Sequence, residues 1–123
     1  MIVLDCSAAI SMVNRTIEGD AIQSLILPEE IVIAPELFYV EAASALRKHV
    51  KVGALGKREA LEYLSDVVGR IDEFVPTSEI YIDAFHESIR MDHSIYDMLY
   101  FVLARRHNAT LVTLDKQLIK LCE

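Results

Sequence analysis

Four carboxylates occupy positions where the surrounding sequence is apolar. Asp5 follows the run 2–4, and Asp115 follows "TLVTL" near the other end of the chain. Asp97 lies in the first turn of a predicted apolar helix, and Glu41 interrupts the apolar side of a longer helix. Burial of an unpaired carboxylate is costly, so acids in such places need a partner. A divalent cation is one partner that would satisfy all four.

The donor chemistry of these acids narrows the choice of metal. If the fold brings them together, each close pair repels by about 4 kcal/mol at an effective dielectric constant of about 20. Such a cluster raises the pKa values of its members, opens up or binds a cation. Oxygen ligands without histidine or cysteine favour Mg²⁺ or Mn²⁺ over zinc. The histidines have no ligand-like spacing and are assigned no chemistry, although His93 lies near the predicted site.

Each acid also has an ordinary structural explanation. Asp5 and Asp115 could cap the helices that follow them, and residues 94–97 match the S-x-x-[DE] capping box. Glu41 lies in mid-helix, where the alternative is a solvated side chain that extends toward water. At the level of single residues, both explanations stay open.

Strand-like and helix-like segments alternate along the chain. Strands are predicted at 2–4, at 31–34 and in "TLVTL", with a short additional strand at "FVP". The predicted helices begin at Ser7, Gly19, Pro35, Lys57, Thr77 or Ser78, Ser94 and Asp115. This alternation predicts a three-layer α/β/α fold around a parallel sheet. Because ligands bind beyond the carboxyl ends of parallel strands, Asp5 and Asp115 are expected at one sheet edge.

Length and composition favour one globular domain over residues 1–123. Hydrophobic residues make up 53% and charged residues 25% of the chain. The net charge of -7 argues against binding nucleic acid by bulk electrostatics alone. The start of the chain has no basic leader, no apolar run reaches membrane-spanning length, and the two cysteines lack metal-ligand spacing. A reduced, cytoplasmic protein is expected.

Three segments together resemble a known enzyme family. "MIVLDCSAAI", "APELFYVEAASALRK" and "SIYDMLYFVLARRHNATLVTLD" are similar, in that order, to the acidic motifs of PIN-domain ribonucleases, especially the small VapC-type toxins of prokaryotic toxin–antitoxin pairs. The YD-x-x-Y-x-x-x-A run followed by a strand ending T-x-D is the most specific part. The resemblance implies an α/β/α PIN-like fold with about four parallel strands. It also implies an endoribonuclease that uses Mg²⁺ or Mn²⁺ to hydrolyse phosphodiester bonds.

The resemblance assigns roles residue by residue. Catalytic and metal-binding positions of the family are matched by Asp5, Glu41, Asp97 and, at a more variable position, Asp115. Supporting hydroxyl positions, which orient a carboxylate or a metal-bound water, are matched by Ser7 and Thr113. This sequence departs from the pattern at Ser44, where many members have asparagine, and it lacks the further strand that many members have after the fourth acid.

The same resemblance implies an RNA substrate, a small antitoxin and a homodimer as partners, with no membrane association. A local basic group formed by Arg47, Lys48 and Lys51 follows the helix segment that carries Glu41 and could track an RNA backbone. The alternative is that these cations complement the dipole at a helix end.

Other classes fit the residues less well. Ser7 occupies the position where a haloacid-dehalogenase-type phosphatase needs its second acid, and no G-x-G-x-x-G motif for a dinucleotide is present. The remaining alternative is a catalytically inert PIN-like module that binds RNA or protein. The presence of all four acids argues against it, because a binding module gains nothing from a repelling cluster.

Overall fold

A single parallel sheet forms the centre of the molecule. We describe residues 1–122 in a computed structural model of the chain. The strands are β1 (Ile2–Leu4), β2 (Val32–Pro35), β3 (Glu73–Val75) and β4 (Thr110–Val112). They pair in parallel in the order β3-β2-β1-β4. The prediction of a parallel sheet of about four strands is therefore confirmed, and β4 is an edge strand.

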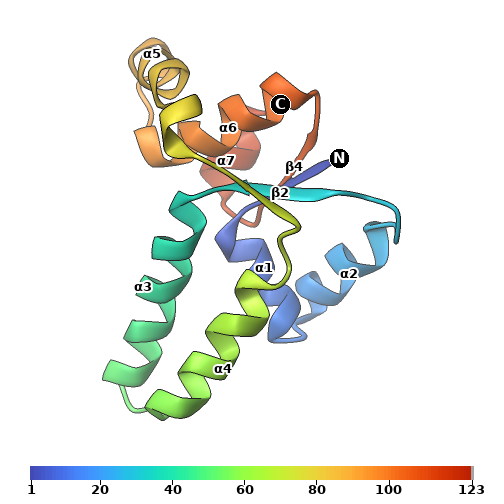
Figure 1. Cartoon of the computed structure of the whole chain (residues 1–123), viewed down its shortest axis with the longest axis vertical. Helices are drawn as coiled ribbons and strands as arrows, with labels where there is room; N and C mark the ends of the chain where they lie inside the picture. The colour runs from blue at the N-terminus through green and yellow to red at the C-terminus, as the bar shows by residue number, and fades with distance from the viewer. Residues whose placement is uncertain (123) are drawn as a thin grey trace.

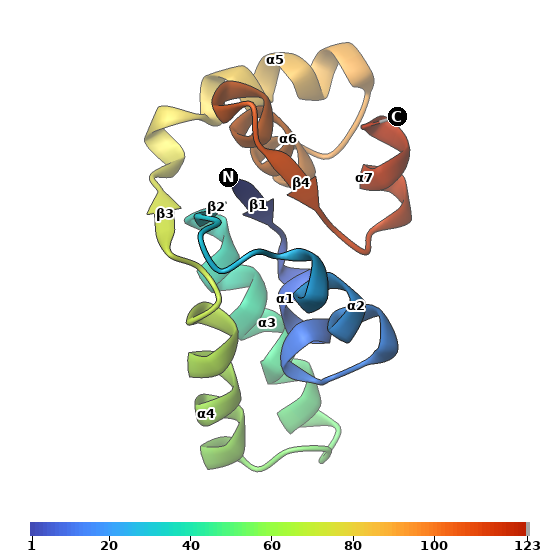
Figure 2. The same ribbon diagram turned by 90° about the vertical axis from the view of Figure 1, so that its right-hand side faces the viewer.

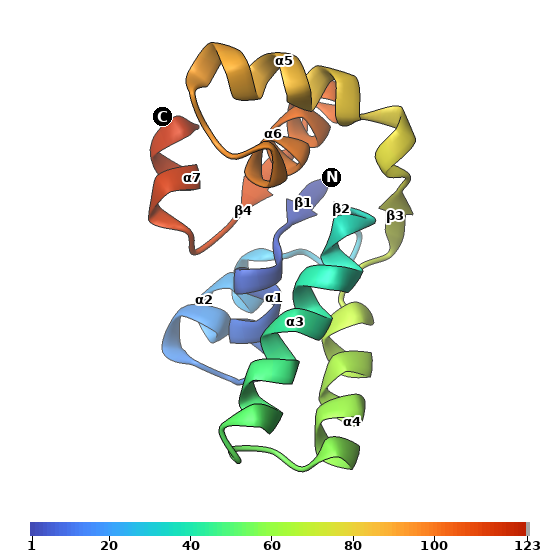
Figure 3. The same ribbon diagram turned by 90° about the vertical axis from the view of Figure 1, so that its left-hand side faces the viewer.

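Helices cover both faces of this sheet. On one side lie α1 (Cys6–Val13), α2 (Ile17–Leu25), α3 (Leu37–Lys51) and α4 (Lys57–Val68). On the other lie α5 (Tyr81–Met91), α6 (Ile95–His107) and α7 (Lys116–Leu121), after a short 3-10 turn, η1 (Thr77–Glu79). The three layers are seen in Figure 1, and Figures 2 and 3 show that the two helical layers stay on opposite sides of the sheet. The predicted α/β/α architecture is confirmed.

The central helix of the second layer is α6, which packs between the sheet and α5. Six of its residues are buried: Met98, Leu99, Tyr100, Val102, Leu103 and Ala104. Because these residues lie on nearly every side of the helix, α6 has only a small solvent-facing surface. Asp97 lies in the half-exposed first turn of α6, directly before this buried stretch begins at Met98. Within residues 1–122, no helix is both long and apolar enough to cross a lipid bilayer.

The prediction that Pro35 opens a helix is wrong. Pro35 is the last residue of β2 and pairs with Val75 of β3, and α3 begins only at Leu37. The backbone N–H of Glu36 donates to the carbonyl oxygen of Val75 at 3.0 Å, which extends the β2–β3 pairing one residue further. Contact with β3, which is distant in sequence, thus overrides the local preference of proline for a helix start.

Two predicted helix starts also differ from the structure. Ser7 does not cap α1, because Asp5 does so by accepting a hydrogen bond from the backbone N–H of Ala8 at 3.0 Å. The α2 helix begins at Ile17, before the predicted start, with Thr16 as its cap.

A third predicted start is wrong at α5. Thr77 and Ser78 lie in η1, and α5 begins at Tyr81 without a side-chain cap. Two predicted helix ends are confirmed, because Gly53 and Asn108 both adopt positive φ just beyond α3 and α6.

The α1 and α2 helices meet at a glycine. A Cβ atom placed on Gly19 would lie 2.0 Å from the backbone carbonyl oxygen of Ser11, far inside van der Waals contact. Gly19→Ala is therefore expected to lower the free energy of unfolding by about 1–3 kcal/mol, the usual cost of overpacking. Urea denaturation followed by circular dichroism measures this loss. Gly56→Ser, at the open N-cap of α4, is the control and should cause little change, and an equally small change at Gly19 would contradict the close contact.

Candidate active site

Asp5 is the buried centre of the site. Leu4 of β1 pairs with Val112 of β4, so the next residues along the two strands, Asp5 and Thr113, also meet. The Thr113 hydroxyl donates to Oδ2 of Asp5, and the Ser7 hydroxyl donates to Oδ1 at 2.8 Å. Asp5 is only 6% exposed. Both predicted hydroxyl residues therefore lie where they orient this carboxylate.

The pKa of Asp5 lies above its ordinary value because burial disfavours the charged form. Hydrogen bonds from Thr113, Ala8 and Ser7 oppose this shift, and the negative charge of Asp115 adds to it. Asp5 is thus a carboxylate whose charge the protein only partly compensates. A nearby cation would lower its pKa and stabilise the ionised form.

Glu41 enters the site from α3. Its Oε1 accepts a hydrogen bond from the phenol of Tyr100 on α6 at 2.5 Å. Burial raises the pKa of Glu41, the Tyr100 hydrogen bond lowers it, and the charges of Asp5 and Asp97 raise it further. The alternative of a fully solvated side chain does not hold, because Glu41 is half-buried and bonded to the core. Its coupling to two other acids places Glu41 within the same carboxylate group.

Asp97 is bound by a histidine instead of completing a capping box. The Ser94 hydroxyl accepts a hydrogen bond from the backbone N–H of Tyr96 at 3.2 Å, so Ser94 does cap α6. Oδ2 of Asp97, however, lies 2.8 Å from Nε2 of His93. The alternative that Asp97 completes a capping box with Ser94 therefore does not hold, because its carboxylate is paired with His93.

Asp115 both caps α7 and belongs to the acid group. Its Oδ1 accepts hydrogen bonds from the backbone N–H groups of Gln117 and Leu118, at 2.9 and 3.4 Å. Its own backbone N–H donates to the Thr113 hydroxyl at 3.0 Å, and that hydroxyl donates to Asp5. Capping and membership of the site are therefore compatible for Asp115, and Thr113 connects the two aspartates.

Cys6 adjoins the acids but is unsuited to nucleophilic or ligand chemistry. Burial raises the pKa of its thiol to about 12, with further contributions from the charges of Glu41 and Asp5. A metal ligand or nucleophile must be the thiolate, which is scarce at neutral pH when the pKa is this high. Cys6 therefore acts as a small buried side chain.

The oxygens that remain free suit a hard cation. Within residues 1–122, Oε2 of Glu41, Oδ1 of Asp97 and Oδ2 of Asp115 take part in no protein hydrogen bond. In the same part of the chain, no three His, Cys, Asp or Glu side chains already surround a point that would hold a metal ion. The acids are coupled through their charges, and each is held by a neighbouring side chain or N–H group. Their donor chemistry fits Mg²⁺ or Mn²⁺, and binding would require them to converge.

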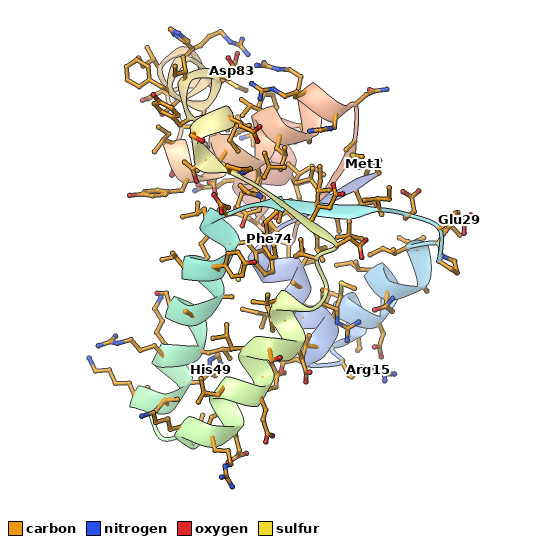
Figure 4. All side chains as sticks on the ribbon, in the orientation of Figure 1. Met1, Arg15, Glu29, His49, Phe74 and Asp83 are labelled. Carbon is orange, nitrogen blue, oxygen red and sulfur yellow. The ribbon has the colours of Figure 1, made fainter. Side chains whose placement is uncertain are left out.

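The predicted basic group lies away from the acids. Arg47, Lys48 and Lys51 are all exposed in the second half of α3. Figure 4 shows His49 in the same region, near the tip formed by α3 and α4, where nitrogen-ended side chains gather. Glu41 lies near the other end of α3, so these cations do not compensate the acids directly.

Two residues of the site were not predicted from the sequence. Its apolar surroundings in the sequence suggest that Tyr100 is a core residue, yet its phenol donates a hydrogen bond to Glu41. His93 has no histidine partner, but it lies four residues before Asp97, just ahead of the Ser94 cap of α6. That spacing was the available signal for His93, whereas Tyr100 contacts a residue 59 positions away.

Comparison with known proteins identifies this three-layer fold with acids at the carboxyl edge of its parallel sheet. Residues 2–123 match the PIN domain family model. The chain therefore belongs to the PIN-domain family. A search of curated proteins found no match.

Two solved structures share the fold. PAE2754 from Pyrobaculum aerophilum superposes with a TM-score of 0.74 at 22% identity, over 95% of this chain and 81% of that one. VapC20 of Mycobacterium tuberculosis is described as a toxin that cleaves the sarcin–ricin loop. It superposes with a TM-score of 0.73 at 15% identity, over 98% of this chain and 95% of that one.

Proposed function

We propose that this protein is a metal-dependent endoribonuclease, the toxin of a toxin–antitoxin pair, with the whole chain 1–123 as one nuclease domain. The observation that carries the proposal is the coupling of the four acids in a PIN-family fold. Asp5 is coupled to Asp115, and Glu41 is coupled to Asp5 and Asp97. These residues come from the start of α1, the first half of α3, the start of α6 and the cap of α7, so only the fold unites them.

In this proposal, Asp5, Glu41, Asp97 and Asp115 hold Mg²⁺ or Mn²⁺. The bound metal supplies an activated water and neutralises charge on the scissile phosphate. The chain's own residues fix the acids: Thr113 and Ser7 orient Asp5, and further donors hold the other three. Such supporting hydrogen bonds set the direction of ligands and their basicity.

The proposed partners follow from the family and from the surface. A cytoplasmic toxin would act on RNA, form a homodimer and be inhibited by a small antitoxin. Apolar surface for protein contacts is present where a pocket of about 610 Å³ lies between the starts of α3, α5 and α6. Exposed Tyr39, Val40, Tyr81 and Tyr96 line it. Arg47, Lys48 and Lys51 are proposed as RNA contacts farther along α3.

Calorimetric titration of Mn²⁺ into metal-free protein tests the metal site without a choice of RNA. We expect the wild type to bind and Asp97→Asn to bind at least about tenfold more weakly, because the variant replaces a charged ligand by a neutral amide. Asp66→Asn, the same chemical change on an exposed residue of α4, should bind like the wild type. Absence of binding by folded wild-type protein would contradict the proposal.

Cleavage is then measured on single-stranded RNA and on hairpins, including a sarcin–ricin loop. Cleavage that requires Mn²⁺ or Mg²⁺ would support the proposal of a metal-dependent endoribonuclease. Binding of metal and RNA without cleavage would instead support the catalytically inert module.

A further inference from the structure

An open surface pocket adjoins the pair formed by His93 and Asp97 and is not used by the chemistry proposed above. It has a volume of about 520 Å³ and is lined by His93, Gln117, Lys120 and Leu121. Its walls come from the turn between α5 and α6 and from α7, which stand side by side in Figure 3. Because the pocket is open to solvent, it could seat one nucleotide of a bound strand without enclosing it.

The pocket is connected to the acid group on two sides. His93 lines it and lies 2.8 Å from Oδ2 of Asp97. Gln117 and Lys120 belong to the short helix that Asp115 caps. A strand of RNA with one phosphate at the acids would therefore place a neighbouring nucleotide close to this pocket.

The wall that carries His93 is held by several hydrogen bonds. The backbone N–H of His93 donates to the carbonyl oxygen of Ser88 at 3.1 Å, and the Ser88 hydroxyl donates to the carbonyl oxygen of His93 at 2.5 Å. Asp92 adopts a left-handed conformation and ends α5 immediately before this residue. The backbone of His93 is thus held beside α5, and its imidazole is paired with Asp97.

The chemistry of the lining suits a phosphate. Lys120 is exposed and forms no ion pair or hydrogen bond through its ammonium group within residues 1–122. Gln117 offers an amide that can donate to phosphate or to a base edge. On a chain with net charge -7, a cation in the last turn of the helix that Asp115 caps offsets local repulsion of a polyanion.

Resting on the proposed ribonuclease function, we infer that the pocket between His93 and α7 binds the RNA nucleotide next to the scissile phosphate, with Lys120 as its phosphate contact. The assignment adds a substrate contact on α7, on a different element from the basic residues of α3. It also gives the α5–α6 turn a role in substrate binding, through the wall that His93 forms.

Lys120→Ala tests this assignment, with Lys116→Ala as the matched control. Lys116 is an exposed lysine on the same helix that does not line the pocket, so both variants lose the same charge. Binding of a fluorescently labelled single-stranded RNA is measured by anisotropy over a series of KCl concentrations, in an Asp5→Asn background that prevents cleavage. Cleavage kinetics are measured with the original Asp5 and Mn²⁺.

We expect Lys120→Ala to weaken RNA binding about fivefold at ~0.15 M salt and to reduce the salt dependence by about one phosphate contact. KM should rise by a similar factor with kcat little changed, and Lys116→Ala should follow its parent protein in both assays. If Lys120→Ala and Lys116→Ala behave alike while the wild type cleaves RNA, the pocket assignment is overturned and the proposed function stands. A wild-type protein that neither binds nor cleaves RNA would overturn both.

Discussion

Replacing Asp5 with asparagine is expected to abolish RNA cleavage and to leave the fold intact. The loss should reach about 10²–10³-fold or more, because the variant removes a charge that would hold the metal at the centre of the site. The fold should survive because asparagine is as good an N-cap as aspartate, so the hydrogen bond from the Ala8 N–H to residue 5 is retained. Cleavage of a labelled RNA in Mn²⁺ and a urea denaturation curve measure the two effects separately.

The same change at other acids provides the comparison. Asp66→Asn should retain full activity, since Asp66 is exposed on α4. Asp115→Asn should lose less activity than Asp5→Asn, because its family position is the more variable one and asparagine preserves the cap on α7. An Asp5→Asn protein that is inactive because it is unfolded would support a purely structural role for Asp5. An effect at Asp115 as large as that at Asp5 would contradict the ranking.

The second large effect is a reversal of pH dependence by metal. Burial raises the pKa of Asp5 and of Glu41 in the folded protein, so the folded state binds protons more tightly than the unfolded chain. Their contribution to stability is therefore complete below the ordinary values of 3.8 and 4.5 and is lost as pH rises through the raised folded values. With Mn²⁺ the sign should invert, because the metal binds the ionised carboxylates.

The free energy of unfolding should therefore be measured at about pH 5 and about pH 7.5, with EDTA and with Mn²⁺, for the wild type and for Asp5→Asn/Glu41→Gln. In EDTA, the double variant should gain stability relative to the wild type as pH rises. In Mn²⁺, the wild type should gain stability relative to the double variant as pH rises.

Glu87 contributes to the pH dependence of stability in the opposite direction to Asp5 and Glu41. Hydrogen bonds from Arg90 and Arg105 lower its pKa, so its contribution is present above its ordinary value and is lost as pH falls. Because Glu87 is the same in both proteins, it cancels in the difference between them. A difference that does not change with pH would contradict the raised pKa values of Asp5 and Glu41.

The local elements were largely predictable because they rest on short-range patterns. Buried β-branched runs predicted β1, β2 and β4, and the residues at positive φ after α3 and α6 were identified as helix ends. One error arose because a distant segment took over, and others arose because a local helix-start signal was misplaced. Pro35 stayed in β2 because β3 pairs with it, and Thr77 and Ser78 entered a 3-10 turn before α5. Ser7 and Gly19 were likewise misplaced as helix starts, because Asp5 and Thr16 are the caps.

The acids themselves were visible in the sequence, but their partners were not. The chain alone determined that Asp5 and Asp115 each follow a strand and that Glu41 and Asp97 interrupt apolar helix faces. Only the tertiary structure decided that Thr113 binds Asp5 across 108 positions and that Tyr100 binds Glu41 across 59. The reason is physical: a hydroxyl or phenol takes whichever acceptor the packing brings within about 3 Å, and packing joins residues that no local pattern relates.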